Sequence, residues 1–433
     1  MDDRVAAYSR RAALGGIGAF SAALLGSVVS PAVARADQLP PPDYGVDVRR
    51  LGAKGDGQTD DTAAVQHALD LAGTGGSHLV VVPPGVYRIT QPLTAIAPIH
   101  IAGLGGEASS VLNFEGSLPS GLTITQASTE EPYPGPPIEL SGLTFQYGGP
   151  GAALFISEDG VRSPFQNTRV SGCRFYVRGS ATGLSSLNQR SLVVTQCQFL
   201  GSGHSTGIAI NDSDNTTIVQ NVFYHMQYGI HGIRGAVRVY NAGCVVIGNS
   251  MSGFEKALFF ENWESVQIVG NMLDGASLQC VHLVDCYRGS LSGNYLGPTG
   301  TESALLIETS SPRGGLGQLM FQDNYINHYA GNNGLAAIGV IGASPQLPVD
   351  QVTIGGNIIN GYPAQGAVHL KNAQNVLITG NTLNRASSSA DGVMAIYDET
   401  PGANHIVHNI VDADIVADGD TVTDNFTRVP VPA

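Results

Sequence analysis

From residue 170 onward, apolar and polar positions alternate in short runs, and each run ends in the same phrase. The phrase places Asn or Cys between apolar positions, after a small or polar residue. Its copies read VSGCRF (170–175), VTQCQF (194–199), IVQNVF (218–223), VIGNSM (246–251), IVGNML (268–273), LSGNYL (291–296), FQDNYI (321–326), IGGNII (354–359) and ITGNTL (378–383). The Asn or Cys positions lie 22–33 residues apart, and 24 is the commonest gap.

This repeat predicts an all-β solenoid in which short coils stack as a parallel β-helix. Alternation with a period of two sends every second side chain into the interior. A coil of this length cannot bury its own apolar side chains, so neighbouring coils must cover one another. The Asn falls where the chain turns between strands, and there its amide can bond the same Asn of the next coil. Residues 138–411 contain no window of ten residues with a helical period, so helical repeats are excluded.

A single amphipathic helix is predicted near the start of the repeat region. Thr59, Asp60 and Asp61 supply a helix start, and an apolar stripe follows at Val65, Ala68, Leu69 and Ala72. Such a helix can cover the open end of a stacked core.

Residues 46–48, 51–66 and 78–87, which include LGAKGDGQTDDTAAVQ and HLVVVPPGVY, resemble the opening of the pectate-lyase superfamily. The likeness is to its pectate lyase 3 and polygalacturonase-like group. It implies a right-handed parallel β-helix with an N-terminal capping helix over most of residues 44–426. Polygalacturonases, lyases, epimerase-like proteins and phage tailspikes share this scaffold, and a homotrimer is one assembly that it implies. The predicted organisation is a signal peptide (1–36), an N-terminal cap with the first coils (37–115), and further coils (116–433).

The first 36 residues resemble a twin-arginine export signal. Arg10 and Arg11 precede an uncharged run over residues 12–29, and Ala34 and Ala36 offer small residues for cleavage. The expected location is secreted or periplasmic, with no membrane segment once the signal is removed. A single membrane anchor is the alternative, since the apolar run reaches the short limit for a bilayer span.

The charge and the cysteine content argue against a nucleic-acid partner and against a metal site. The net charge is −14 and Lys stands only at positions 54, 256 and 371, so no basic stripe for a nucleic acid is present. Five Cys without a CxxC pair favour small buried residues over a zinc site or a complete set of disulfides. We therefore expect no metal and no cofactor.

Two glutamates are the candidate catalytic residues. If Leu258 and Phe260 point inward, the same parity places Glu261 outside, and the corresponding strands expose His282 and Glu308. Coils about 4.8 Å apart would separate Glu261 from Glu308 by roughly 9–10 Å. That spacing suits an inverting glycosidase, in which one carboxyl protonates the leaving oxygen and the other activates water. His282 would lie between them; the alternative is that all three are solvated strand residues.

A second candidate set would bind substrate. His231, Arg234 and Lys256 fall on neighbouring coils, and a lyase needs such groups to neutralise a uronate and to remove its proton. Trp263 could stack on a sugar ring, although a lone Trp is more often a packing residue.

These residues, together with the resemblance, predict a secreted carbohydrate-active enzyme acting on a polysaccharide or oligosaccharide, with glycoside hydrolysis favoured over lyase chemistry. The alternative is a non-catalytic polysaccharide-binding or cell-surface β-helix protein. It stays open because the acidic motifs of polygalacturonases and the calcium-binding Asp set of pectate lyases are not matched.

Overall fold

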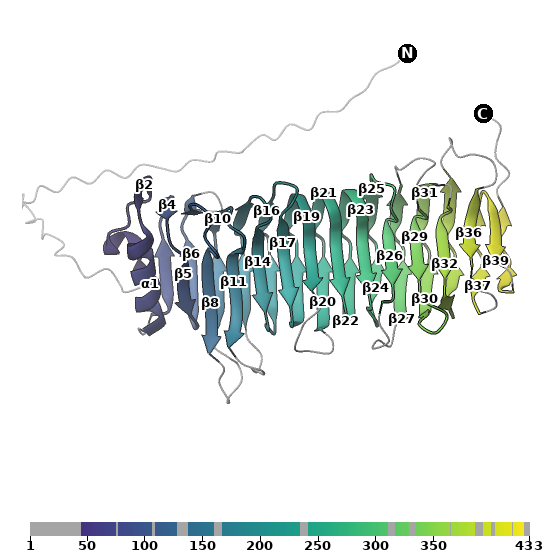
Figure 1. Ribbon diagram of the computed structural model, residues 1–433, viewed down its shortest axis with the longest axis horizontal. Coiled ribbons are helices and arrows are strands. Elements are labelled where there is room, and N and C mark those ends of the chain that lie inside the picture. Colours follow the sequence, from purple (N-terminus) through teal and green to yellow (C-terminus); the bar gives the residue numbers. More distant parts are fainter. Residues whose placement is uncertain are drawn as a thin grey trace, which may run out of the picture. The chain divides into compact units, whose positions relative to one another are not determined.

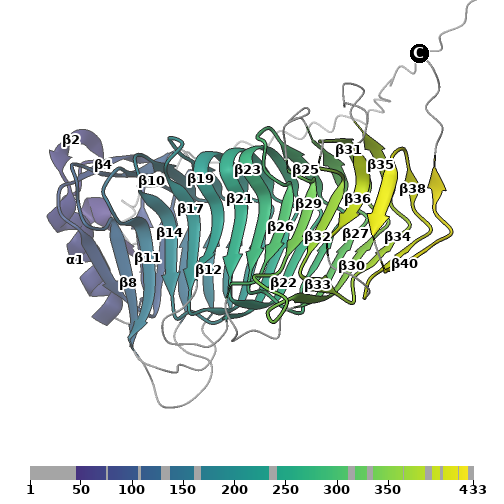
Figure 2. The ribbon, with the colours of Figure 1, turned by 45° about the vertical axis from the view of Figure 1, so that its right-hand side comes forward.

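The computed structural model describes residues 45–427 except 75–76, 106–108, 128–136, 160–166, 234–240, 311–316, 329–334, 364, 386–392, 400–402 and 418. The signal predicted at residues 1–36 lies outside the described residues. Within the described part, the chain winds through parallel strands that pair with the coils before and after them (Figures 1 and 2). The predicted parallel β-helix is confirmed.

One side of the solenoid is a 16-stranded sheet, here sheet 1. Its strands are β1 (Val46–Asp47), β3 (Leu79–Val82), β6 (Ile99–Gly103), β9 (Ile138–Ser141), β12 (Thr168–Ser171), β15 (Leu192–Thr195), β18 (Asp214–Val219), β20 (Asn241–Ile247), β22 (Trp263–Val269), β24 (Ser290–Ser292), β27 (Gly317–Gln322), β30 (Val349–Gly355), β33 (Ala373–Gln374), β34 (Leu377–Thr379), β37 (His405–Val407) and β40 (Thr421–Thr423).

The remaining strands form two ladders that join in three long strands, β19 (Val222–Ile233), β21 (Ser250–Glu261) and β23 (Met272–Val284). Ladder 2 also contains β2 (Asp56–Asp60), β4 (Gly85–Ile89), β7 (Ser110–Phe114), β10 (Leu143–Tyr147), β13 (Arg174–Val177), β16 (Gln198–Leu200), β25 (Tyr295–Pro298), β28 (Tyr325–Asn327), β31 (Ile358–Tyr362), β35 (Thr382–Arg385), β38 (Ile410–Val411) and β41 (Phe426–Thr427). Ladder 3 also contains β5 (Leu93–Ile96), β8 (Leu122–Ala127), β11 (Ala152–Asp159), β14 (Thr182–Leu187), β17 (Thr206–Asn211), β26 (Leu305–Glu308), β29 (Ile338–Ile341), β32 (Val368–Lys371), β36 (Met394–Asp398) and β39 (Asp414–Ala417).

The Asn residues of the repeat form a continuous column between sheet 1 and ladder 2, buried as far as Asn409. Each side-chain amide donates to the amide oxygen of the next Asn at 2.9–3.0 Å. The column consists of Asn221, Asn249, Asn271, Asn294, Asn324, Asn357, Asn381, Asn409 and Asn425. Cys197 extends it, because its backbone N–H donates to Asn221 Oδ1 at 2.8 Å. This confirms the role predicted for the repeat.

Stacked rings fill the interior beside this column. Phe145, Phe175, Phe199 and Phe223 follow one another on ladder 2 with centroids 4.9, 4.7 and 4.7 Å apart. Each ring therefore packs on its copy in the next coil, which fixes the register of the outward side chains as well.

The predicted helix is α1 (Thr62–Thr74), which follows the short 3₁₀ helix η1 (Val48–Leu51) and packs beside β5 (Figure 1). Its buried residues are those of the predicted stripe, Val65, Ala68, Leu69 and Ala72. Asp61 accepts hydrogen bonds from the backbone N–H groups of Lys54 and Gly55, at 2.6 and 3.0 Å. The Asp61 carboxylate thus holds the turn at Lys54 and Gly55 together. In the described ranges, no helix has both the length and the apolar character of a membrane span.

All five cysteines are free and buried, as the sequence predicted. Burial raises the pKa of the Cys286 thiol to about 12, and it raises the pKa values of Cys244 and Cys280 as well. Because the thiolate is the reactive form, the folded protein is expected to react with a thiol reagent only after denaturation. Titration with such a reagent should find five thiols in denaturant and none within minutes without it; rapid labelling of the folded protein would contradict this burial.

Candidate functional site

Three outward columns cross ladder 3 where the two ladders join. In the part of each strand that belongs to ladder 3, the outward residues are Tyr228, His231 and Ile233 on β19, and Lys256, Phe259 and Glu261 on β21. The register pairs Tyr228 with Lys256 and His231 with Phe259. The next coils continue the columns through Gln279, His282, Val284, Leu306 and Glu308. These strands lie side by side (Figure 2), and we call this group the ladder 3 cluster.

Three of its side chains form a hydrogen-bonded chain across successive coils. Lys256 Nζ lies 2.8 Å from His282 Nδ1, and His282 Nε2 lies 2.7 Å from Glu308 Oε2. When the ammonium of Lys256 donates to Nδ1, the proton of the neutral imidazole resides on Nε2 and is donated to Glu308. The His282 ring is buried, whereas the Glu308 side chain is 38% exposed. The Glu308 carboxylate is therefore the end of this hydrogen-bonded series that a substrate could reach.

A second carboxylate–imidazole pair lies on the other side of Phe259. His231 Nε2 is 3.4 Å from Glu261 Oε2, and the Glu261 side chain is 34% exposed. The Phe259 ring stacks between the rings of His231 and His282, at 4.8 and 4.9 Å. Lys256 Nζ lies 4.3 Å from the centre of the Phe259 ring. The ring thus holds both imidazoles and the ammonium in place.

The cluster keeps its carboxyl groups ionised. The hydrogen bond from His231 lowers the pKa of Glu261, and the hydrogen bond from His282 lowers the pKa of Glu308. Burial lowers the pKa of Lys256, although Glu308, Glu261, Glu255 and Glu302 act in the opposite direction. Both glutamates are therefore ionised near neutral pH.

The register predicted for the glutamates is confirmed. Glu261 pairs with Val284, and Val284 pairs with Glu308, so the two glutamates occupy one column two coils apart. His282 lies in the intervening coil, as expected. The catalytic roles of these residues remain predictions.

The substrate-binding candidates have different outcomes. His231 and Lys256 belong to the ladder 3 cluster, whereas Arg234 lies outside the described residues. The prediction that Trp263 stacks on a sugar is wrong, because this side chain is fully buried and packs edge-on against Phe260 at 5.6 Å. Trp263 begins β22 after a turn at Asn262, and its ring points into the core.

Phe259 was assigned no role in the site from the sequence. Tyr228 lies 4.8 Å from His231, ring to ring, and burial raises the pKa of its hydroxyl. The parity that exposes Glu261 also exposes Phe259, so the sequence contained a signal for the ring. Among the described residues, no group of three or more His, Cys, Asp or Glu side chains is arranged to hold a metal ion.

Two family models match the chain. Residues 45–147 match "Rhamnogalacturonase A/epimerase, pectate lyase-like", and residues 110–273 match "Right handed beta helix region". The mannuronan C5-epimerase AlgE1 of Azotobacter vinelandii is 43% identical over 70 residues, which are 14% of this chain and 5% of the epimerase. The aligned segment is thus a small part of that relative.

Solved structures resemble a much larger part of the fold. The A-module of the Azotobacter vinelandii mannuronan C-5 epimerase AlgE6 has a TM-score of 0.56 at 18% identity, covering 89% of this chain and all of the module. The catalytic unit of a GH87 alpha-1,3-glucanase from Streptomyces thermodiastaticus has a TM-score of 0.54 at 16% identity, covering 84% of this chain and 69% of the glucanase. At these identities the likeness establishes the fold alone. The chain is therefore a right-handed parallel β-helix protein, whose residues 45–147 match the pectate-lyase-like family model and whose residues 110–273 match the model of right-handed β-helix regions.

Proposed function

We propose that this chain is an exported enzyme that cleaves glycosidic bonds in a carbohydrate polymer, and that the ladder 3 cluster is its active site. The observation that carries the proposal is the pair of partly exposed carboxylates of Glu261 and Glu308, two coils apart on one outward face and each bonded to an imidazole. Two strand spacings amount to roughly 9–10 Å, near the carboxyl separation that an inverting hydrolase uses to admit a water molecule.

The pKa directions assign different roles to the two carboxylates. Glu261, held ionised by His231, is the base that takes a proton from the attacking water. Glu308 is the exposed end of the hydrogen-bonded series that runs from Lys256 through His282. A proton drawn from Lys256 and His282 therefore passes to the leaving oxygen through Glu308. This proton relay replaces the expectation that one of the two glutamates would itself be protonated in the resting enzyme and act as the acid.

A second candidate is chemistry at C5 of a uronate, either elimination or epimerisation. The epimerase relatives and the position of Lys256 against His282 favour it, because such chemistry needs a cation beside the substrate carboxylate and a base for its proton. The four glutamates around Lys256 oppose it, since they repel a polyanion. Hydrolysis of a neutral or weakly charged glycan is therefore the better-supported reaction.

The test is incubation of the mature protein with α-1,3-glucan, alginate and a panel of plant and microbial polysaccharides. New reducing ends without the absorbance of unsaturated uronates support hydrolysis. Absorbance of that kind, or a changed uronate composition without cleavage, establishes the C5 chemistry instead. Retained binding without any product would overturn catalysis and leave a binding protein.

The activity is expected to be bell-shaped in pH. The pKa values of Glu261 and Glu308 lie below the ordinary 4.5, so the ionised base is lost only when the pH falls through those lowered values. The pKa of Lys256 lies below the ordinary 10.5. The proton that Lys256 supplies is therefore lost as the pH rises through this lowered pKa. Measurement of kcat/KM against pH should show both limbs. An acid limb centred above pH 4.5 would contradict the assignment of Glu261 as an ionised base.

A further inference from the structure

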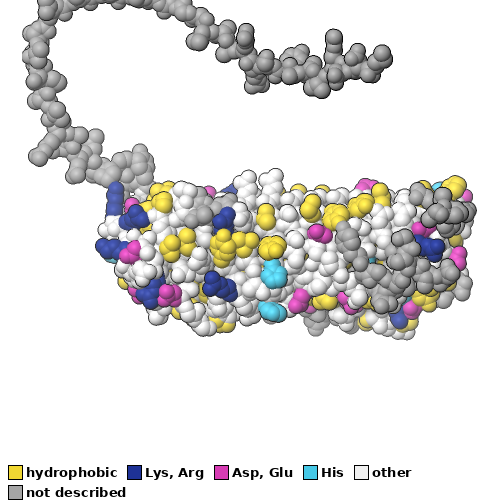
Figure 3. Space-filling model, turned by 90° about the horizontal axis from the view of Figure 1, so that it is seen from above, with side chains coloured by type: hydrophobic (Ala, Val, Ile, Leu, Met, Phe, Trp, Pro, Cys, Tyr) yellow, Lys and Arg dark blue, Asp and Glu magenta, His cyan; other side chains and the backbone are white. Residues whose placement is uncertain are grey.

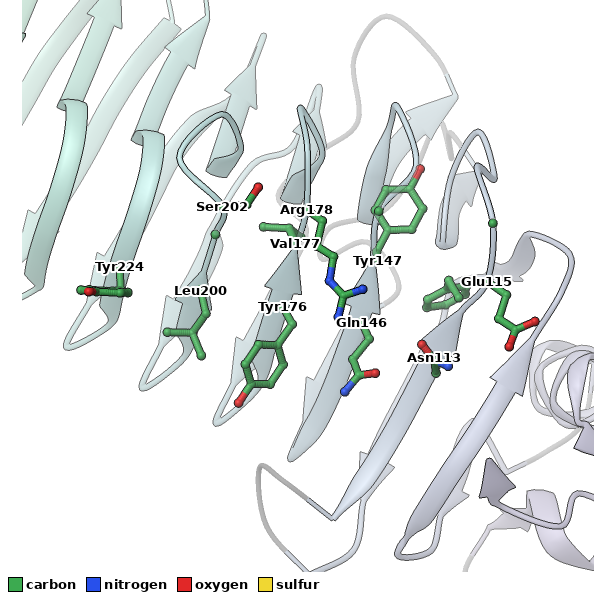
Figure 4. Close-up of a pocket in the computed structure, with 14 residues that line it drawn as sticks. Asn113, Glu115, Gln146, Tyr147, Tyr176, Val177, Arg178, Leu200, Ser202 and Tyr224 are labelled. Carbon is green, nitrogen blue, oxygen red and sulfur yellow. The ribbon is translucent and has the colours of Figure 1, made fainter. Parts of the chain in front are cut away.

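A groove of about 930 Å³ lies on ladder 2, over β7, β10, β13, β16 and β19 (Figure 4). It begins several coils before the ladder 3 cluster and faces outward from a different ladder. None of the groups proposed for catalysis lines it.

The floor of the groove has one outward side chain from each coil. The register pairs Asn113 with Gln146 and Gln146 with Tyr176. It then pairs Tyr176 with Leu200 and Leu200 with Tyr224. These side chains therefore follow one another along the solenoid axis at the coil spacing of about 4.8 Å. A binding surface of this form suits an extended chain of repeating units.

The wall of the groove is formed by the turn after ladder 2. Tyr147 is buried there, and its hydroxyl donates to the carbonyl of Leu118 at 2.7 Å and accepts from the N–H of Gly151 at 3.1 Å. Arg178 extends from the same wall toward Gln146 and Tyr176 (Figure 4). Arg178 lines the groove, and within the described ranges its guanidinium forms no ion pair.

The floor combines amides with aromatic rings. The side-chain amides of Asn113 and Gln146 make no hydrogen bond to another described residue, so their donors and acceptors remain available to a ligand. Tyr176 and Tyr224 are 38% and 57% exposed. Figure 3 shows a row of hydrophobic side chains along the molecule, with Lys and Arg gathered toward the end that carries α1. Rings that pack on C–H faces, beside amides that bind hydroxyls, match the surface of a sugar chain.

We propose that this groove binds a stretch of the polysaccharide that is not being cleaved. Its last floor residue, Tyr224, and Tyr228 of the ladder 3 cluster both belong to β19, so a bound chain leaves the groove on the coil where the cluster begins. The inference rests on the proposed function only for the identity of the polymer. A peptide adding as a strand is not favoured, because β7, β10, β13 and β16 are already paired on both edges.

The experiment measures binding and turnover separately. Binding is followed by co-sedimentation with insoluble α-1,3-glucan and by affinity electrophoresis in alginate, for the wild type and for Tyr176→Ala, Tyr224→Ala and Gln146→Ala. Tyr325→Ala is the matched control, because Tyr325 is 40% exposed on ladder 2 in a coil beyond the groove. Tyr176→Ala and Tyr224→Ala are each expected to weaken binding about 3–10-fold, the range for loss of one ring contact. Gln146→Ala is expected to weaken it by a similar factor, the range for loss of one hydrogen bond. Turnover of a short oligosaccharide that cannot reach the groove should stay unchanged.

The outcomes separate this inference from the proposed function. Weaker binding in the groove variants with normal binding in Tyr325→Ala supports the inference, even when no polysaccharide is cleaved. Equal binding in all variants overturns it, even when cleavage is observed. A wild-type protein that binds neither polymer also overturns it.

Discussion

Replacement of Glu308 by Gln is expected to lower turnover of the cleaved polysaccharide by about 10²–10⁴-fold, the range for loss of a general acid or base. Gln is nearly the same size as Glu and still accepts a hydrogen bond from His282 Nε2. In the wild-type protein this nitrogen lies 2.7 Å from the Glu308 carboxylate. It cannot receive a proton and pass it to a leaving oxygen. Glu261→Gln removes the base for water and is expected to have an effect of similar size. The measurement is kcat on the polymer identified by the panel.

The chain offers a matched control for this loss. Glu399 accepts from His369 Nε2 at 2.9 Å, and its other oxygen pairs with Lys371 at 3.2 Å, so it also joins a histidine and a lysine at the surface of ladder 3. Glu399→Gln should keep nearly full turnover. Full activity in both Glu261→Gln and Glu308→Gln would end the assignment. An equal loss in Glu399→Gln would indicate a general effect of surface charge.

The fold and the outward orientation of the glutamates could be predicted, because both depend on the local pattern of apolar and polar residues. Alternation fixes which side chains leave the core, and the Asn column fixes where each coil starts. Counting residues from the Asn column alone would not have predicted which outward residues pair between coils. Phe259 is 10 residues after Asn249, whereas its partner His282 is 11 residues after Asn271, and the extra residue is absorbed where the register shifts between Phe254 and Lys256. Aligning the apolar residues of each strand gave the correct partners.

The errors and omissions come from turns and from contacts between coils. Parity cannot be carried through Asn262, whose φ of +60° turns the chain from β21 into β22, so inside and outside could not be assigned there. The contact of Lys256 with His282 runs diagonally from one coil to the next. Its geometry depends on side-chain conformations that a sequence pattern does not determine. The groove on ladder 2 was missed because its residues share no chemistry until the coils are stacked.

Removal of one Asn side chain from the buried column is expected to destabilise the solenoid more than any surface substitution. Asn294 Oδ1 accepts from the backbone N–H of Asn271 at 2.9 Å, and its Nδ2 donates to the carbonyl of Ile268 at 2.9 Å. In Asn294→Ala both buried partners lose these bonds, and each unsatisfied group costs about 1–3 kcal/mol, so a loss of about 2–6 kcal/mol in the free energy of unfolding is expected. Denaturant unfolding followed by circular dichroism measures it.

Two further variants test whether the acceptor or the mere volume matters. Cysteine fills the same position in the first coils, where the N–H of Cys173 donates to Cys197 Sγ at 3.4 Å, so Asn294→Cys should recover part of the loss. Asn384→Ala removes an amide that bonds Asn360 Oδ1 at 2.7 Å on the outer face, and a change within about 0.5 kcal/mol is expected there. If Asn294→Ala unfolded at the same denaturant concentration as Asn384→Ala, the column would not stabilise the stacking of the coils. The register that brings Glu261 and Glu308 into one column would then have to be held by the apolar core alone.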